Sequence, residues 1–164
     1  MEKKIFATFI LSCLVCLCVS GQTDFDRKLK SLYKNTVPLI HTEELAKVKD
    51  NVILLDTRSP EEFQVSHIAN ARFLDYDKFN SKTVIPIDKN ATIIVYCSVG
   101  YRSERVGEKL REMGYKNVTN LYGGIFDWVN NGETVVNKSE VATDSVHTYN
   151  KDWSRWLIKG VKVY

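Results

Sequence analysis

The sequence predicts an α/β fold, a three-layer sandwich in which a mostly parallel five-stranded sheet is flanked by helices on both faces. Two observations predict it. Short runs rich in Val, Ile and Leu alternate with amphipathic stretches of about six to twelve residues, the pattern of a parallel sheet with crossover helices. The composition, 44% hydrophobic and 26% charged over 164 residues, is that of one folded domain rather than a disordered chain.

The predicted strands and helices follow one another along the central part of the chain. Ser59, Pro60 and Glu62 form a capping box that begins one helix, and Gly114 is a C-cap glycine that ends another. Strands are predicted over residues 37–40, 51–55, 70–74, 92–96 and 118–122. Helices are predicted over residues 23–33, 42–48, 60–66, 103–114 and 123–128, with a brief helical turn over 76–81.

The first residues have the pattern of a secretory signal peptide. Lys3 and Lys4 precede about fifteen nearly uninterrupted apolar residues, fewer than the ~20 of a membrane-spanning helix, and Gly21 predicts cleavage before Gln22. We therefore expect a secreted protein of the bacterial periplasm with no stable membrane span. Lipid anchoring at Cys13, which ends a lipobox-like run, is the alternative.

The chain divides by its patterns into four parts. Residues 133–164 turn polar and regain apolar content only toward the end, where Trp153 and Trp156 are expected to pack the tail on the core. The expected parts are a signal peptide (1–21), an N-terminal helical extension (22–35), the α/β domain (36–132) and a C-terminal extension packing on it (133–164).

Charge and cysteine content narrow the class of protein. The net charge of +3 comes from 23 basic and 20 acidic residues without a basic cluster, which argues against a nucleic-acid or membrane-surface partner. Of the four cysteines, signal cleavage leaves Cys97 alone, which excludes a disulfide scaffold. A single thiol in an oxidising compartment is either buried or used.

The residues after Cys97 favour a reactive thiol. The predicted buried strand 92–96 runs directly into the loop 97–103 (CSVGYRS) and then a helix, so backbone N–H groups and the helix dipole converge where an anion is stabilised. Gly100 permits a short loop, Arg102 adds a positive charge and Ser103 is expected to cap the helix. A buried structural cysteine, the alternative, needs none of these residues.

Here the sequence resembles the rhodanese-homology family, over about residues 36–132. Ser66, Ala69 and Asn70 stand where Gly, Pro and Gly are commoner in the family. Four motifs carry the resemblance in order: residues 54–63 (LLDTRSPEEF), 66–71 (SHIANA), 97–103 (CSVGYRS) and 121–128 (LYGGIFDW).

The resemblance implies a sulfurtransferase. Cys97 would take the sulfane sulfur of thiosulfate or a related donor, hold it as a persulfide, and pass it to cyanide or a thiol, including the thiol of a protein partner. It implies catalysis by Cys97 and substrate binding by the following loop, without metal or organic cofactor. The implied substrate-binding residues are Ser98, Val99, Gly100, Tyr101, Arg102 and Ser103.

Two other functions remain open. Cysteine phosphatases and arsenate reductases also place an arginine after a nucleophilic cysteine, but with five intervening residues, whereas Cys97 and Arg102 enclose four. This smaller loop suits a sulfur atom better than a tetrahedral oxyanion. The second alternative is a non-catalytic interaction or redox-sensing module.

We also expect particular roles for several single residues in and around the loop. Asp56, at the end of a predicted strand, is a candidate to hydrogen-bond the loop from behind. Arg58 is expected to form a structural ion pair with Glu62. Tyr101, at the loop tip, is expected to face the donor and influence its selection. The three histidines lack ligand-like spacing and are expected to be structural or exposed: His41, His67 and His147.

Overall fold

A computed structural model describes residues 24–164. The predicted signal peptide over residues 1–21, including Cys13, lies outside the described residues and stays a prediction. Residues 24–32 form a helix in which Phe25 and Leu29 are buried and Asp24 and Arg27 are exposed. Residues 33–164 form a second, compact unit, which contains everything described below.

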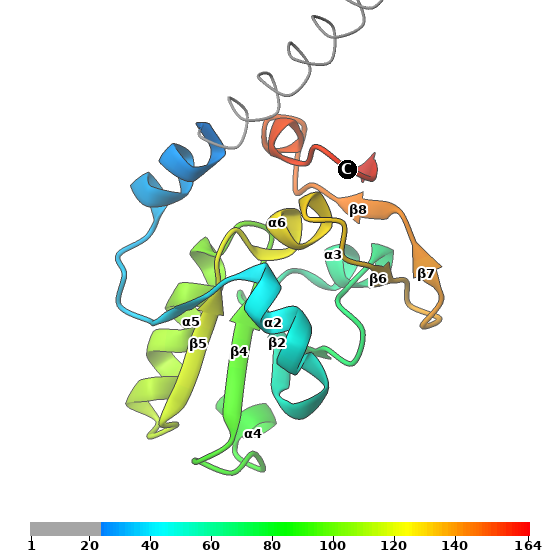
Figure 1. Cartoon of the computed structure of the whole chain (residues 1–164). Helices are drawn as coiled ribbons and strands as arrows, with labels where there is room; N and C mark the ends of the chain where they lie inside the picture. The colour runs from blue at the N-terminus through cyan, green and yellow to red at the C-terminus, as the bar shows by residue number, and fades with distance from the viewer. Residues whose placement is uncertain (1–23) are drawn as a thin grey trace, which may run out of the picture. The chain divides into compact units, whose positions relative to one another are not determined.

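The central sheet of this unit is parallel throughout and has the strand order β1-β5-β4-β2-β3 (Figure 1). All five predicted strands are present, so the fold class is confirmed. Their bounds are Leu39–Ile40 (β1), Ile53–Asp56 (β2), Arg72–Phe73 (β3), Thr92–Tyr96 (β4) and Asn117–Leu121 (β5).

Helices cover both faces of the sheet, with α2 and α5 on opposite sides in Figure 1. Alternate residues of β4 explain why: Ile93 and Val95 join a core cluster with Val106 and Leu110 of α5, while the neighbouring Ile94 is buried on the other face. The helices are Thr42–Val48 (α2), Pro60–Val65 (α3), Ser81–Val84 (α4), Tyr101–Glu112 (α5) and Gly124–Asn130 (α6), with a 3-10 turn, η1, at Lys49–Asn51.

Two predicted helix starts are wrong. The helical turn expected over residues 76–81 is displaced to α4, because the Asp75 carboxylate accepts the Asp77 and Lys78 N–H groups in a local turn, and Asn80 then caps α4. The helix expected from residue 103 begins at Tyr101, because Gly100 with φ 91° serves as its N-cap. The predicted capping box of Ser59 and Glu62 is confirmed.

The motif that departs from the family pattern keeps its turn. Asn70 has φ 66°, a left-handed conformation that asparagine tolerates better than most residues, and it stands where glycine is commoner. Ile68, just before it, is buried, and its N–H donates to the Tyr96 hydroxyl at 3.0 Å. The asparagine therefore replaces the glycine without loss of the turn.

The C-terminal extension forms two small strand pairs. Strand β6 (Val135–Val136) pairs antiparallel with β7 (Ala142–Thr143), and β8 (Ser145–His147) pairs parallel with β9 (Val161–Val163). Strand β8 packs against α3, and Asn130 of α6 bonds the Trp156 carbonyl and the Ile158 N–H. Trp156 ends a 3-10 turn, η2 (Trp153–Trp156). The extension thus lies on the domain along α3 and the end of α6.

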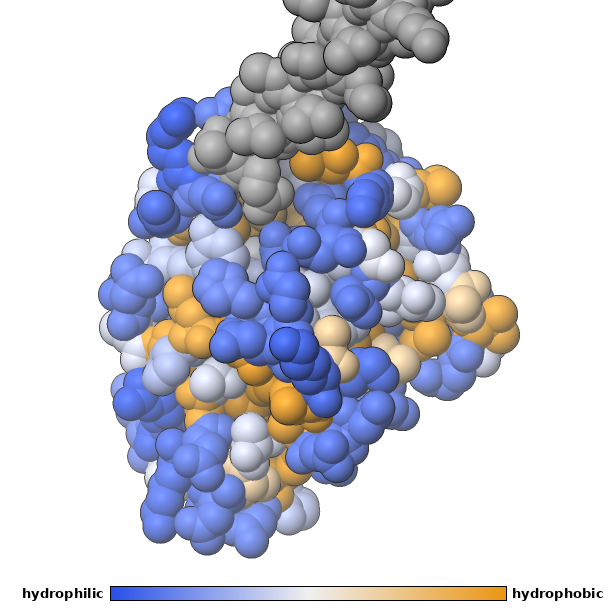
Figure 2. Space-filling view, viewed as in Figure 1, coloured by the Kyte–Doolittle hydropathy of each residue, from blue (hydrophilic) through white to orange (hydrophobic). Residues whose placement is uncertain are grey.

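On the face seen in Figure 2, hydrophobic side chains are interrupted by hydrophilic ones. Among residues 24–164 no helix is long and apolar enough to cross a membrane.

Candidate active site

Cys97 lies directly after β4, between the ends of β2 and β5, and is 1% exposed. The carboxyl ends of parallel strands are where ligands of open α/β sheets bind, so the residue stands at the expected edge. The loop that follows it, up to Gly100, is buried as well.

Four successive carbonyl groups of this loop are bound by groups outside it. The Cys97 and Ser98 carbonyls accept from the first turns of α6, from Ile125 N (2.9 Å) and Phe126 N (3.2 Å). The Val99 carbonyl accepts from the Tyr33 hydroxyl at 2.7 Å, and the Gly100 carbonyl from the Asn120 side chain at 3.0 Å. Each carbonyl of residues 97–100 is therefore held in a fixed direction.

This anchoring determines where the N–H groups point. In a trans peptide the C=O and the following N–H lie in one plane and point in opposite directions, so outward carbonyls turn the N–H groups inward. The Gly100 N–H lies 3.2 Å from the Cys97 sulfur. The first intrahelical bond of α5 is donated by Glu104 N, which leaves the three preceding N–H groups available to an anion.

Two glycines are required for this arrangement. A side chain at Gly100, where φ is 91°, would collide with the Tyr33 hydroxyl, and one at Gly124 would collide with the Cys97 carbonyl. Helix α6 can therefore approach the loop closely enough to bind its carbonyls only because residue 124 has no side chain.

The guanidinium of Arg102 is bound edge-on by Glu62. Its two terminal nitrogens lie 2.7 Å from the two Glu62 oxygens, and Nη2 also donates to the Ser98 hydroxyl at 3.0 Å. The Ser98 hydroxyl in turn donates to Glu62 at 2.7 Å. Cys97 also contributes to the raised pKa of Arg102. Glu62 thus links α3 to both ends of the loop.

The charges of this pair stabilise each other. Burial alone would raise the pKa of Glu62, but the hydrogen bonds and charge of Arg102 outweigh burial and lower that pKa to about 2. Burial alone would lower the pKa of Arg102, and its contacts with Glu62 raise it instead. Both groups are therefore ionised at neutral pH, and the pair has no net charge.

Arg58 does not pair with Glu62 as predicted. Both Arg58 and Asp56 are fully buried, and the Asp56 carboxylate accepts three side-chain bonds from Arg58, at 2.9 and 3.2 Å from Nε and 2.6 Å from Nη2. Nη2 also donates to the Ser66 carbonyl at 2.5 Å. Asp56 therefore bonds Arg58 rather than the loop, because the arginine two residues later folds back over it.

The remaining loop residues are placed as follows. Val99 is 6% exposed and Tyr101 is 44% exposed, with its ring against Arg105. Ser103 does not cap α5 as expected: its hydroxyl donates to the Asn120 side chain at 2.7 Å, because the helix begins two residues earlier. Ser103 therefore supports the loop indirectly, through the amide that holds the Gly100 carbonyl.

Sequence reasoning missed four residues at this site. Glu62 is predicted from the sequence only as a helix cap and a partner of Arg58, and Asn120 only as part of a strand. The Tyr33 hydroxyl accepts from Gly123 N at 2.9 Å and donates to the Val99 carbonyl. The guanidinium carbon of Arg102 lies over the ring of Tyr149 in the extension, 5.4 Å from the ring centre. All four contacts join residues distant in sequence, and no local pattern marks them.

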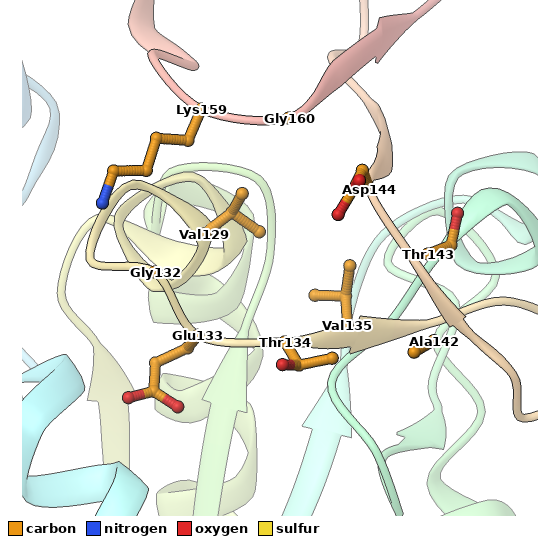
Figure 3. A pocket seen from close by; sticks show the side chains of 10 residues that line it. All are labelled: Val129, Gly132, Glu133, Thr134, Val135, Ala142, Thr143, Asp144, Lys159 and Gly160. Carbon is orange, nitrogen blue, oxygen red and sulfur yellow. The ribbon is translucent and has the colours of Figure 1, made fainter.

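Two further features lie outside the loop. A cavity of about 400 Å³ opens between the end of α6 and the extension, with Glu133, Asp144 and Lys159 in its lining (Figure 3). Its lining contains no residue of the Cys97 loop. His67 is 2% exposed, stacks on Phe63, and bonds Glu140 at 3.0 Å, so it joins the domain to the extension.

The nucleophile-bearing loop, closed between a parallel strand and a helix, defines the class of protein. The sequence pattern of the rhodanese-like domain matches residues 41–131, and the chain belongs to that family. Thiosulfate sulfurtransferase GlpE of Coxiella burnetii is 35% identical over 85 residues, which are 52% of this chain and 78% of that protein.

Two other relatives illustrate the range of the family. A tRNA uridine(34) hydroxylase of Erwinia tasmaniensis is 31% identical over 81 residues, 46% of this chain but 23% of that protein. The crystal structure of a rhodanese-related protein from Thermoplasma volcanium is similar with a TM-score of 0.55 and 28% identity, covering 60% of this chain and 97% of that one.

Proposed function

We propose that this protein is a sulfurtransferase that carries a sulfane sulfur on Cys97, from thiosulfate or a related donor to cyanide or a thiol. The observation that carries the proposal is the anchoring of the loop: its carbonyls are bound from outside, and the Gly100 N–H lies 3.2 Å from the sulfur of Cys97. The likeness to a thiosulfate sulfurtransferase supports the same reading.

In the first half-reaction the Cys97 thiolate attacks the outer sulfur of the donor. With thiosulfate, a sulfur–sulfur bond forms to Cys97, the bond to the sulfonate sulfur breaks, and sulfite leaves with the electron pair. The product is a Cys97 persulfide anion. The N–H groups at the start of α5 stabilise negative charge on either sulfur, so one loop accommodates both the thiolate and the persulfide.

In the second half-reaction the acceptor attacks the outer sulfur of the persulfide. Cyanide leaves as thiocyanate, and a thiolate acceptor leaves as a persulfide; in each case the electron pair returns to Cys97 as the thiolate. No net oxidation occurs, and neither half-reaction calls for a metal or an organic cofactor.

The contacts of Arg102 argue against the oxyanion alternative. A phosphatase or arsenate reductase needs an arginine whose two terminal nitrogens clamp the substrate oxygens. Here both nitrogens bind Glu62 at 2.7 Å. Transfer of a sulfur atom makes no such demand on the guanidinium.

The test is the intact mass of the protein before and after incubation with thiosulfate or polysulfide. We expect a gain of one sulfur that cyanide removes and that Cys97→Ser lacks. Ser98→Ala serves as a thiol-retaining comparison, in which the gain persists. A chain that gains no sulfur from either donor while Cys97 alkylates rapidly would overturn the proposal in favour of a redox sensor.

We also propose that the protein is exported after cleavage before Gln22. The charged start, the apolar run and the small residues before Gln22 support this. Expression of the full chain followed by fractionation and N-terminal sequencing tests it: a chain beginning at Gln22 outside the cytoplasm is expected, and a lipid-modified Cys13 at the N-terminus would favour the alternative.

A further inference from the structure

The C-terminal extension reaches the Cys97 loop from outside the matched family domain. Its strand β8 packs against α3, the helix that carries Glu62, and is held there by the fully buried Val146 and Thr148. The Thr148 N–H donates to the Val163 carbonyl of β9 at 2.8 Å. The extension is thus a fixed element beside the ion pair of the site.

Tyr149, two residues beyond the end of this strand, has an unusual backbone conformation. Tyr149 has φ 65°, and its N–H donates to the His147 ring at 3.1 Å. A tyrosine in the left-handed region is uncommon and persists where surrounding contacts hold it. The guanidinium carbon of Arg102 lies over the Tyr149 ring, 5.4 Å from the ring centre, and Tyr149 is 56% exposed.

Arg102 is therefore contacted from two directions. Glu62 and Ser98 bind its terminal nitrogens, and its guanidinium carbon lies over the ring of Tyr149. Within residues 97–103 Arg102 is the one cationic residue. The neighbouring Arg58 and Arg105 are each bound to carboxylates as well, to Asp56 and to Glu104 and Glu108.

These contacts matter differently to different sulfur donors. Thiosulfate is a dianion, and its sulfonate binds better where it can reach a cation at the entrance. A persulfide carries at most one charge on its sulfurs and releases a thiolate, so it needs only the N–H groups of the Cys97 loop and makes no demand on Arg102.

We propose that Tyr149 is a specificity-determining residue of this site: by covering Arg102 it makes the entrance favour persulfide donors over thiosulfate. The proposal rests on the proposed sulfurtransferase function. In the favoured step the Cys97 thiolate attacks the terminal sulfur of R–S–SH, a bond forms between the two sulfurs, the S–S bond of the donor breaks, and R–S⁻ leaves with the electron pair. The proton stays on the transferred sulfur.

The experiment compares cysteine persulfide with thiosulfate as donor, by following formation of the Cys97 persulfide and steady-state turnover. Tyr149→Ala uncovers the guanidinium, so we expect the KM for thiosulfate to fall about threefold while kcat stays unchanged. The kcat/KM for cysteine persulfide is expected to stay within about 1.5-fold of the wild-type value. The wild-type protein is expected to have the higher kcat/KM with the persulfide.

Two variants serve as controls. Tyr149→Phe keeps the ring over Arg102, and Tyr164→Ala removes an exposed tyrosine elsewhere in the extension, 62% exposed. Both should behave as the wild type with either donor. A merely structural role for Tyr149 would lower kcat with both donors together.

The outcomes separate this inference from the proposed function. Equal changes with the two donors in Tyr149→Ala, no change with either, or a wild-type kcat/KM for thiosulfate as high as that for the persulfide would overturn the role of Tyr149, although Cys97 transfers sulfur. If neither donor places a sulfur on Cys97 of the wild-type protein, the sulfurtransferase function itself fails.

Discussion

Two arginine–carboxylate pairs lie near the carboxyl end of β2, and they differ in what surrounds them. In the Asp56–Arg58 pair both side chains are 0% exposed and bind each other, and Arg58 also donates to the Ser66 carbonyl. In the Glu62–Arg102 pair the arginine side chain is 16% exposed and donates to the Ser98 hydroxyl next to Cys97.

The two pairs therefore have different roles: the first stabilises the fold, and the second shapes the site around Cys97. The buried pair pins the turn after β2, because Arg58 donates to both the Asp56 carboxylate and the Ser66 carbonyl. The second pair joins α3, Ser98 and Arg102 and so sets the electrostatic surroundings of Cys97. Removing a charge from the first pair should therefore affect folding, and removing one from the second should affect the site.

The largest expected effect is that of Asp56→Ala on stability. The substitution leaves the Arg58 guanidinium buried without a counter-charge, and we expect a loss of about 3–5 kcal/mol in the free energy of unfolding. Urea unfolding measures it. The matched control, Asp50→Ala in the surface pair with Lys49, should leave the midpoint unchanged. Equal midpoints for the two variants would contradict the distinction between the pairs.

The second effect is the pH dependence introduced by Glu62. Its pKa is lowered from 4.5 to about 2, so its contribution to stability is fully present above pH 4.5 and is lost as the pH falls toward 2. By linkage this contribution is about 3 kcal/mol. Glu62→Gln should therefore be less stable than the wild type at neutral pH, and the difference should shrink progressively below pH 4.5.

Unfolding midpoints at pH 7 and pH 3 measure this convergence. Glu112→Gln, at an exposed position near the end of α5, is the control and should show none. We also expect Glu62→Gln to slow persulfide formation on Cys97 by about tenfold, because Arg102 and Ser98 lose their common partner. A constant stability difference over this pH range would mean that Glu62 does not ionise against Arg102.

The smallest effect tests the loop without changing either ion pair. Gly100 and Gly114 have almost the same φ, 91° and 89°, but only at Gly100 would a side chain collide with a neighbour, Tyr33. Each alanine substitution incurs the cost of the left-handed conformation, about 1 kcal/mol, and Gly100→Ala about 1–2 kcal/mol more.

Persulfide formation by the two variants then completes the comparison. Gly100→Ala should lower its rate, because the N–H that lies 3.2 Å from the Cys97 sulfur shifts with the loop. Gly114→Ala should keep the wild-type rate. Equal rates in the two variants would show that the position of this N–H is unimportant.

Local sequence patterns were enough to predict the sheet, its strands and the Cys97 loop. Alternation of apolar runs with amphipathic stretches depends on short-range periodicity, and the capping box of Ser59 and Glu62 depends on contacts three residues apart. The same patterns misplaced the starts of α4 and α5, because side-chain and glycine caps within two residues of a boundary shift it.

Local sequence patterns did not predict which charged and polar side chains bind one another. Sequence spacing suggested an Arg58–Glu62 pair, yet Arg58 folds back on Asp56, and Glu62 binds Arg102, forty residues away. A carboxylate can bind a cation near or far in the sequence, and the path of the folded backbone decides which one lies within reach. No local pattern in the sequence indicates which cation a given carboxylate binds.

By itself the sequence determined the α/β architecture, the place of Cys97 at the end of a buried strand, and the loop of N–H groups that follows it, because all three arise from hydrogen bonds and burial within a few residues. Tertiary structure alone settled that α6, Tyr33 and Asn120 hold the loop carbonyls, that Glu62 neutralises Arg102, and that Tyr149 covers it. Those contacts join segments that are brought together only when the sheet and the extension close around one core.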